Sequence, residues 1–112
     1  PTSIIVPIGT WKIEDTVMQH VKVNSGTGVN SLVTLSTSNS SESDNELTAF
    51  VGANAPTGAV DGWNTSYKTK IISVAAKTTY YLLTKSTLTG MTLLEIRGDL
   101  AKTIVRAICV YL

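Results

Sequence analysis

The sequence predicts an all-β fold: an antiparallel β-sandwich or jelly roll of about eight strands. Valine, isoleucine and threonine are abundant, and apolar and polar residues alternate with a period of two. Apolar residues nowhere recur at the spacing of an amphipathic helix over three turns. Glycine, asparagine, serine and proline interrupt the alternation at short intervals, which is typical of sandwiches and jelly rolls.

The expected strands are short runs of alternating residues between these interruptions. Turn chemistry is expected at Ser25-Gly26-Thr27-Gly28 and at Thr89-Gly90, and a longer loop at residues 53–64. The strands that we expect lie at residues 2–8, 16–24, 31–37, 47–52, 67–75, 79–84, 91–97 and 103–112.

The length and composition indicate one domain, residues 1–112, that is poor in charge. A chain of 112 residues buries enough surface for one core. Only 15% of the residues are charged, against about 25% in an average globular domain, so we expect oligomerisation to cover part of the surface. The formal net charge of +1 is spread without blocks, which argues against nucleic acid or an anionic membrane as a partner.

The ends and the apolar runs give further expectations. No apolar run approaches the roughly 20 residues of a membrane-spanning helix, so we expect no integral membrane segment. The start at Pro1 has neither an initiator methionine nor the pattern of a signal peptide, which suggests the C-terminal piece of a longer chain.

The expected last strand carries the main interaction hypothesis. Both of its faces are apolar, whereas one face of an antiparallel sheet normally meets water, so we expect it to be central in the sandwich or packed on another subunit. A chain that ends on apolar residues favours an interface, and the low charge fits a trimer. The residues expected at or near the trimer interface are Ile104, Arg106, Ile108, Val110 and Leu112.

Arg106 shares a face with Ile104 and Ile108 and therefore needs an anionic partner. Glu95 or Asp99 of the same chain is the simplest choice. A carboxylate of a neighbouring subunit or a trapped small anion is the alternative, and for the small anion we name Arg97 together with Arg106.

Few residues suggest catalysis, so we expect no enzyme, no cofactor and no metal. His20 is the only histidine, has no second ligand at metal spacing, and is expected at or near the surface. The pair Glu14-Asp15 is expected to be solvated. Cys109 cannot form an internal disulfide and is expected to be a small buried hydrophobe.

The serine-rich segment at residues 36–46 is expected to be an exposed, mobile loop. Its acids Glu42, Asp44 and Glu46 alternate, so a calcium site is conceivable, but the glycine and the final bidentate glutamate of an EF-hand are missing. We favour solvation of these acids.

Three short motifs in the sequence resemble recognition or modification signals, but we assign none of them a function. Arg97-Gly98-Asp99 spells a tripeptide that some animal receptors recognise, but a turn after a strand is the favoured interpretation. The glycosylation patterns Asn39-Ser40-Ser41 and Asn64-Thr65-Ser66 receive no role, because polar loops generate them freely.

Trp63 lies in the stretch Asp61-Gly62-Trp63-Asn64, which is expected to be a loop. Its indole either folds back as a lid on the core or, with Asn64, offers a platform for a receptor or glycan. The second possibility gives the competing functional hypothesis, a monomeric carbohydrate-binding module or adhesin domain.

The chain resembles the distal knob of a trimeric phage tail needle or fibre, and most nearly the tail-needle knob of short-tailed phages. The resemblance rests on the expected sandwich, the start at Thr2-Ser3-Ile4-Ile5-Val6-Pro7, the hydroxyl-rich surface and the flush end at residues 103–112. It implies a jelly roll like that of tumour necrosis factor, a homotrimer at the virion tip outside the cell, and a structural and adhesive role in host-surface contact, envelope penetration and genome delivery. It also implies loops around Trp63 and residues 36–46 that face outward.

Overall fold

The computed structural model describes residues 2–23, 27–55, 60–86 and 91–111, and it confirms the antiparallel sandwich of eight strands. The strands and the single short helix are β1 (Thr2–Val6), β2 (Gly9–Val23), β3 (Thr27–Ser36), the 3-10 helix η1 (Asn45–Leu47), β4 (Thr48–Ala55), β5 (Val60–Val74), β6 (Thr78–Ser86), β7 (Met91–Ile96) and β8 (Ile104–Tyr111). Of the predicted interface residues, Leu112 lies outside the described part of the chain, as do most of the two predicted turns.

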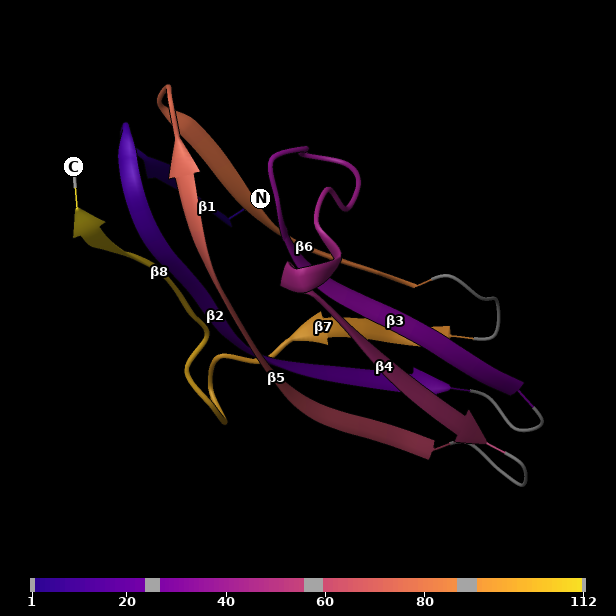
Figure 1. Ribbon diagram of the computed structural model, residues 1–112. Coiled ribbons are helices and arrows are strands. Elements are labelled where there is room, and N and C mark those ends of the chain that lie inside the picture. The colour runs from indigo at the N-terminus through magenta and orange to yellow at the C-terminus, as the bar shows by residue number, and fades with distance from the viewer. Residues whose placement is uncertain (1, 24–26, 56–59, 87–90, 112) are drawn as a thin grey trace.

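Two four-stranded sheets make up the sandwich (Figure 1). The first sheet has the strand order β1-β6-β3-β4. In the second sheet β5 pairs with β2 over fifteen residues, while the other edge of β2 is shared: β8 pairs with its first half and β7 with its second. All of these pairings are antiparallel. The long pair β2 and β5 gives a molecule 54 Å long and only 25 by 20 Å across.

The alternation along β2 decides which residues form the core. Odd-numbered residues from Ile13 to Val23 face the first sheet, and Ile13, Val17 and Val23 are fully buried there. The main core cluster is shared by both sheets and consists of Val6, Ile13, Val17, Val33, Leu35, Leu47, Ala49, Tyr80 and Leu82.

A buried glutamine links the two sheets across this core. Gln19 of β2 is 1% exposed, and its Nε2 donates to Thr84 Oγ1 at 2.7 Å and to the Leu32 carbonyl at 3.3 Å. Ser31 Oγ donates to Gln19 Oε1 at 3.5 Å. A buried amide is tolerated because these partners replace the water that it loses.

Two strands begin well before the predicted residue. β2 begins at Gly9 rather than at residue 16, and β5 begins at Val60 rather than at residue 67. Gly9 has φ 137°, in the left-handed region that favours glycine, so the chain turns there and enters β2 at once. The predicted loop that contained Trp63 is therefore wrong for residues 60–64, which pair with β2.

Candidate functional site

The outer face of the second sheet, turned away from the first sheet, gathers most of the candidate residues. Cross-strand pairing places Tyr67 of β5 beside Thr16 of β2, and Arg106 of β8 beside Glu14 of β2. Because side chains alternate along a strand, one set of positions shares this face. The outer-face residues used below are Lys12, Glu14, His20, Lys22, Asp61, Trp63, Tyr67, Ile71, Glu95, Ile104, Arg106 and Ile108, and Val110 follows them at a bulge of β8.

Glu14 is buried on this face although the described residues place no second layer over it. The residue is 3% exposed, and Tyr67 Oη donates to its Oε2 at 2.8 Å. Arg106 Nε donates to Oε1, and Lys12 Nζ lies 3.6 Å from Oε2. The hydrogen bonds from Tyr67 and Arg106 hold the pKa of Glu14 below its ordinary value. The prediction that Glu14 and Asp15 are solvated is therefore wrong.

Arg106 takes a partner that the sequence did not suggest. The carboxylate that pairs with Arg106 belongs to Glu14 on the adjacent strand β2, not to Glu95 or Asp99. The reason is that β8 pairs with the first half of β2, whereas Glu95 lies beside the second half. The Arg106 side chain is 60% exposed, so it runs across the surface of the sheet. Whether it also meets a small anion or a second subunit stays a prediction.

β8 is open to solvent along the same face. Ile104, Ile108 and Val110 are 40%, 44% and 49% exposed, and Tyr111 is 65% exposed. On the other face of β8, Val105 and Ala107 pack against the core. This strand therefore has apolar side chains on both faces, one of which is uncovered in the single chain.

Cys109 is exposed, which corrects the prediction that it is buried. The pairing of β8 with β2 shifts its register between Thr10 and Trp11, so that Cys109 lies opposite Trp11, Tyr111 opposite Thr10, and Val110 forms the bulge directly after Cys109. The bulge and the nearby end of the strand take this side chain out of the core packing that Val105 and Ala107 keep.

Trp63 and His20 are cross-strand partners at the other end of the outer face. Their rings stack with centroids 3.8 Å apart and planes 9° apart. His20 is 4% exposed, so the prediction of a histidine at or near the surface is wrong. Trp63 is 43% exposed, and it covers His20 rather than the core.

Polar groups surround this stack. His20 Nδ1 lies 2.7 Å from Glu95 Oε1 and donates to it, since that carboxylate is ionised: the hydrogen bond from His20, aided by Arg97, lowers the pKa of Glu95. Within the described part of the chain His20 Nε2 has no hydrogen-bond partner, and it lies 3.6 Å from Asp61 Oδ1. The Arg97 guanidinium carbon lies 5.5 Å from the Trp63 ring centroid.

Arg97 is held by acids of its own strand end. It makes two hydrogen bonds to Asp99, at 2.7 and 2.5 Å, and one to Glu95 at 3.2 Å. This bidentate pair lowers the pKa of Asp99 to about 2. Residues 98–100 form a turn, which confirms that interpretation of Arg97-Gly98-Asp99. The role of Arg97 in holding a small anion stays a prediction.

Asn64 does not share a surface with Trp63. It lies opposite Gln19, on the inner face of β5, and its side chain is half-buried. The platform of Trp63 and Asn64 expected from the sequence is therefore wrong in its second member, because consecutive residues of a strand point to opposite faces.

Asp15 is a fully buried carboxylate on the inner face of β2, and neither of its oxygens has a hydrogen-bond partner among the residues that the structure describes. Lys68 lies opposite it on β5 and Val105 opposite it on β8. Burial raises the pKa of Asp15 to about 6, and the charge of Lys68 opposes this only in part. The burial of Asp15 could have been predicted from the sequence, because this acid occupies an inward position of an alternating strand.

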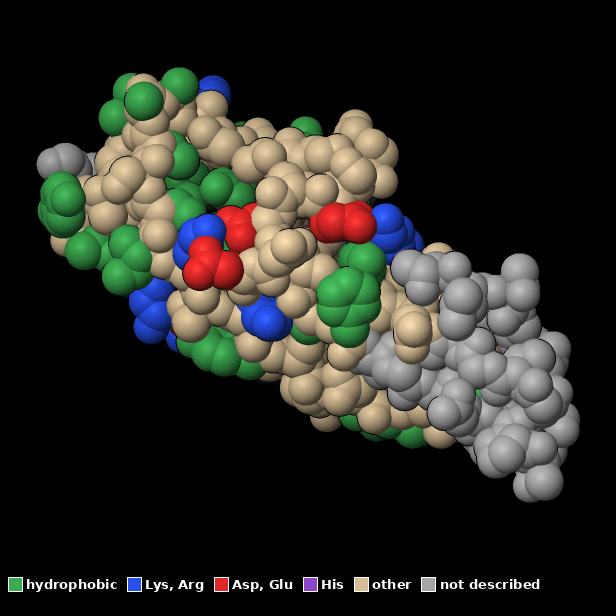
Figure 2. Space-filling view, turned by 45° about the vertical axis from the view of Figure 1, so that its right-hand side comes forward, with side chains coloured by type: hydrophobic (Ala, Val, Ile, Leu, Met, Phe, Trp, Pro, Cys, Tyr) green, Lys and Arg blue, Asp and Glu red, His purple; other side chains and the backbone are tan. Residues whose placement is uncertain are grey.

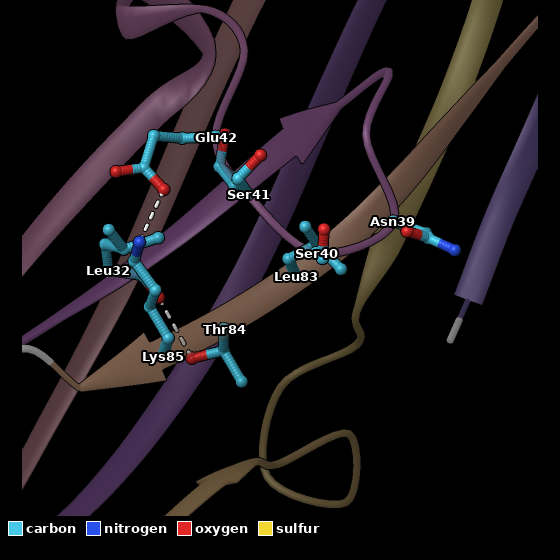
Figure 3. A pocket seen from close by; sticks show the side chains of 9 residues that line it. Leu32, Asn39, Ser40, Ser41, Glu42, Leu83, Thr84 and Lys85 are labelled. Atoms are coloured by element: carbon cyan, nitrogen blue, oxygen red, sulfur yellow. Dashed lines mark hydrogen bonds and ion pairs between the residues drawn. The ribbon is translucent and has the colours of Figure 1, made fainter.

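The serine-rich loop lies over the outer face of the first sheet and encloses a hollow of about 180 Å³ (Figure 3). Leu32 and Leu83 contribute apolar side chains, the loop residues Asn39, Ser40 and Ser41 contribute polar ones, and the 2.6 Å ion pair of Glu42 with Lys85 lies beside them. The loop is exposed over most of its length, as predicted.

The acids of this loop meet lysines of the strands. Asp44 accepts a 2.6 Å hydrogen bond from Lys70, which also pairs with Glu46, while Glu42 pairs with Lys85. Glu42 and Glu46 are exposed, in line with the prediction that these acids are solvated, and the pairing of each acid with a lysine was not predicted. Among the described residues, no group of three or more histidine, cysteine, aspartate or glutamate side chains is placed to hold a metal ion.

The surface charges are mixed rather than separated. Figure 2 shows acidic and basic side chains next to one another on one face of the molecule. In the described part of the chain there is no helix with the length and apolar character needed to cross a membrane.

Comparison of the sequence and structure with known proteins identifies no relative. No family model matches this sequence, and no curated protein or solved structure matches it either.

Proposed function

We propose that this chain is a non-enzymatic subunit of a homotrimer that closes through the β8 end of the outer face and displays its remaining surface for adhesive contact. One observation carries the proposal, the apolar row of β8. Ile104 and Ile108 share the outer face of this edge strand and are 40% and 44% exposed, and Val110 and Tyr111, at the bulge that follows, are 49% and 65% exposed. Ile71 of β5, at the same end of the sheet, is 64% exposed.

This surface has the features of a contact between identical chains. β8 pairs with β2 on one side, and no described strand pairs with its other side. An exposed apolar edge strand invites pairing with another chain, and soluble proteins normally protect such an edge. Each square ångström of apolar surface buried contributes about 25 cal/mol, so covering the row stabilises an assembly.

Glu14 supports the same assignment. It lies beside the apolar row, and its neighbours Tyr67, Arg106 and Lys12 already satisfy the carboxylate. A buried charge at an interface costs little when its hydrogen bonds are complete within one chain. This end of the face could therefore be covered by a second copy without leaving an unpaired acid.

The resemblance to phage knobs supplies the biological setting of the proposal. In that setting the trimer sits at the virion tip, outside the host cell, as the distal end of a needle or fibre. Its work is mechanical and adhesive: contact with the host surface, penetration of the envelope and delivery of the genome. A small carboxylate held between subunits by Arg106 or Arg97 belongs to the same proposal.

Hydrogen–deuterium exchange on the 112-residue chain tests the interface. If β8 lies between subunits, its backbone amides exchange more slowly as protein concentration rises. The amides of β1, an edge strand of the other sheet, are the matched control and do not change. Concentration-independent exchange in β8 contradicts the proposed interface.

A second candidate function is supported by a different observation. Trp63 is exposed and backed by His20, which suits a monomeric carbohydrate-binding module or adhesin domain. The two functions differ in the mass that they predict in solution, and both allow Trp63 to meet a ligand.

A further inference from the structure

We propose that Trp63, Asp61, Arg97 and Asp99 form a binding site for a neutral pyranose sugar on the β7 half of the outer face. The inference rests on the proposed adhesive function and deepens it, because it names the ligand class and the groups that would recognise it. Four observations carry it: a fixed aromatic ring, polar groups at its border, the local balance of charge, and the distance from the proposed interface.

The indole of Trp63 is held in place before any ligand arrives. His20 stacks on one of its faces at 3.8 Å, and His20 is itself buried and bonded to Glu95. β5 is an edge strand of the described sheet, with β2 on one side only. The indole face opposite His20 therefore points away from β2, toward the edge of the sheet. A flat, fixed aromatic face suits the C–H face of a pyranose ring.

Polar groups able to bind hydroxyls border the ring. Asp61 lies two positions before Trp63 on the same face of β5, and its side chain is 52% exposed. The Arg97 guanidinium carbon is 5.5 Å from the ring centroid, and the Asp99 side chain is 60% exposed. Carboxylates accept hydrogen bonds from hydroxyls and the guanidinium donates to them, as recognition of neighbouring sugar hydroxyls requires.

The charge around the ring favours a neutral ligand. Three carboxylates, those of Asp61, Glu95 and Asp99, lie at this end of the sheet, and Arg97 is already paired with two of them. Lys22 lies opposite Asp61 on β2. Among the described residues named here the carboxylates outnumber these two cations by one, so an anionic sugar would meet a net like charge, which acts against it.

The aromatic platform is separate from the apolar row of the proposed subunit interface, although Arg97 is also named there as a possible anion ligand. Trp63 lies opposite His20 of β2 and Ile104, the nearest residue of the row, lies opposite Thr16, four positions along the strand or roughly 13 Å at about 3.3 Å per residue. A trimer closed through β8 therefore leaves Trp63 open. The hollow beneath the serine-rich loop lies on the other sheet, so it is a distinct location that variants can separate from this one.

Fluorescence titration of Trp11→Phe tests the site, because this variant leaves Trp63 as the sole tryptophan. The probes are glucose, galactose, N-acetylglucosamine and, as the anionic match for glucose, glucuronate. We expect a saturable change with at least one neutral sugar, and glucuronate binding about tenfold weaker than glucose where glucose binds.

Variants locate the binding. In saturation-transfer NMR we expect Trp63→Ala to abolish the signal of the bound sugar. Asp61→Asn, which keeps the aromatic platform, is expected to weaken binding about tenfold, a loss of the size of one hydrogen bond to a charged group. Circular dichroism checks that both variants fold.

Each other outcome overturns the site. Either no neutral sugar binds, or binding survives Trp63→Ala and is lost in Ser40→Leu, which would place the ligand in the hollow of the serine-rich loop. Light scattering on the same samples distinguishes the two proposals. A trimer that binds no sugar would support the subunit interface and contradict the sugar site, whereas a monomer that binds sugar would support the site and contradict the interface.

Discussion

Tyr67 Oη donates a 2.8 Å hydrogen bond to Oε2 of Glu14 on the neighbouring strand. The same carboxylate accepts from Arg106 on β8 and faces Lys12 on β2. One buried acid thus ties β5, β2 and β8 together on a face over which the described residues place no second layer of structure. The cluster holds two cations against one carboxylate, and it cross-links three strands at the β8 end of the face.

Replacing Tyr67 by phenylalanine tests this tie. The change removes only the hydroxyl, so we expect the free energy of unfolding to fall by about 1 kcal/mol, the usual contribution of one hydrogen bond. Denaturant unfolding by circular dichroism measures it. Tyr81→Phe on the other sheet is the control, since no hydrogen bond of that hydroxyl is found in the described residues. Equal losses in the two variants would contradict the tie.

Asp15 predicts an unusual pH dependence. Burial raises its pKa from 3.8 to about 6, so the folded state binds a proton more tightly than the unfolded state does. Its contribution to stability is full below pH 4 and is lost as pH rises to about 6. We expect Asp15→Asn to raise the free energy of unfolding at pH 7 by up to about 3 kcal/mol, with almost no gain at pH 3.5.

The difference between wild type and Asp15→Asn isolates this group from the other acids. Glu14, Glu95 and Asp99 have lowered pKa values and act in the opposite direction, since their stabilisation is lost as pH falls. Denaturant unfolding at intervals from pH 3.5 to 7 measures the difference in the free energy of unfolding. The control is Asp61→Asn, since the Asp61 side chain is half-exposed. A gain that is the same at every pH would show that Asp15 does not titrate in this range.

Gln19 joins the two sheets, so replacing it is expected to lower the free energy of unfolding. Gln19→Met keeps the length of the side chain but removes the donor to Leu32 and Thr84 and the acceptor for Ser31. We expect a loss of about 2 kcal/mol, because buried polar groups are left without partners. The measurement is thermal or denaturant unfolding. A stability equal to that of wild type would mean that the glutamine is not a structural link.

The proposed interface predicts an asymmetry between two exposed isoleucines. Ile108 on β8 is 44% exposed and Ile5 on β1 is 60% exposed. A charge at either position should cost the single chain little, since exposed substitutions usually change stability by less than about 0.5 kcal/mol. We expect Ile108→Asp to separate the trimer into monomers and Ile5→Asp to leave it intact, as measured by analytical ultracentrifugation. Trimers of both variants would move the interface away from β8.

Local pattern was sufficient to predict the fold class. Alternation and turn residues predicted eight strands, and each has a counterpart in the structure. The errors lie where an inward position holds a polar residue. Trp11 and Ile13 continue the alternation of β2, but the polar Asp15 interrupts it at an inward position, so β2 was expected to start too late, at residue 16. Tolerating one polar residue at an inward position would have extended the predicted strand to Trp11.

The site residues could be predicted only in part. The two apolar faces of β8 were visible in the sequence, and so was the need of Arg106 for an anion. The identity of that anion was not, because Glu14 meets Arg106 only through the pairing of strands far apart in the chain. The stack of His20 on Trp63 depends on the same kind of register, which a single sequence does not reveal.

The solution mass of the chain, measured by light scattering over a range of concentrations, tests the central claim most directly. Each chain is 11.9 kDa. The account predicts a mass of three chains that persists on dilution, because the apolar row on β8 is covered by other copies. A mass of one chain at every concentration would contradict it, and would leave the exposed Trp63 as the feature that remains to be explained.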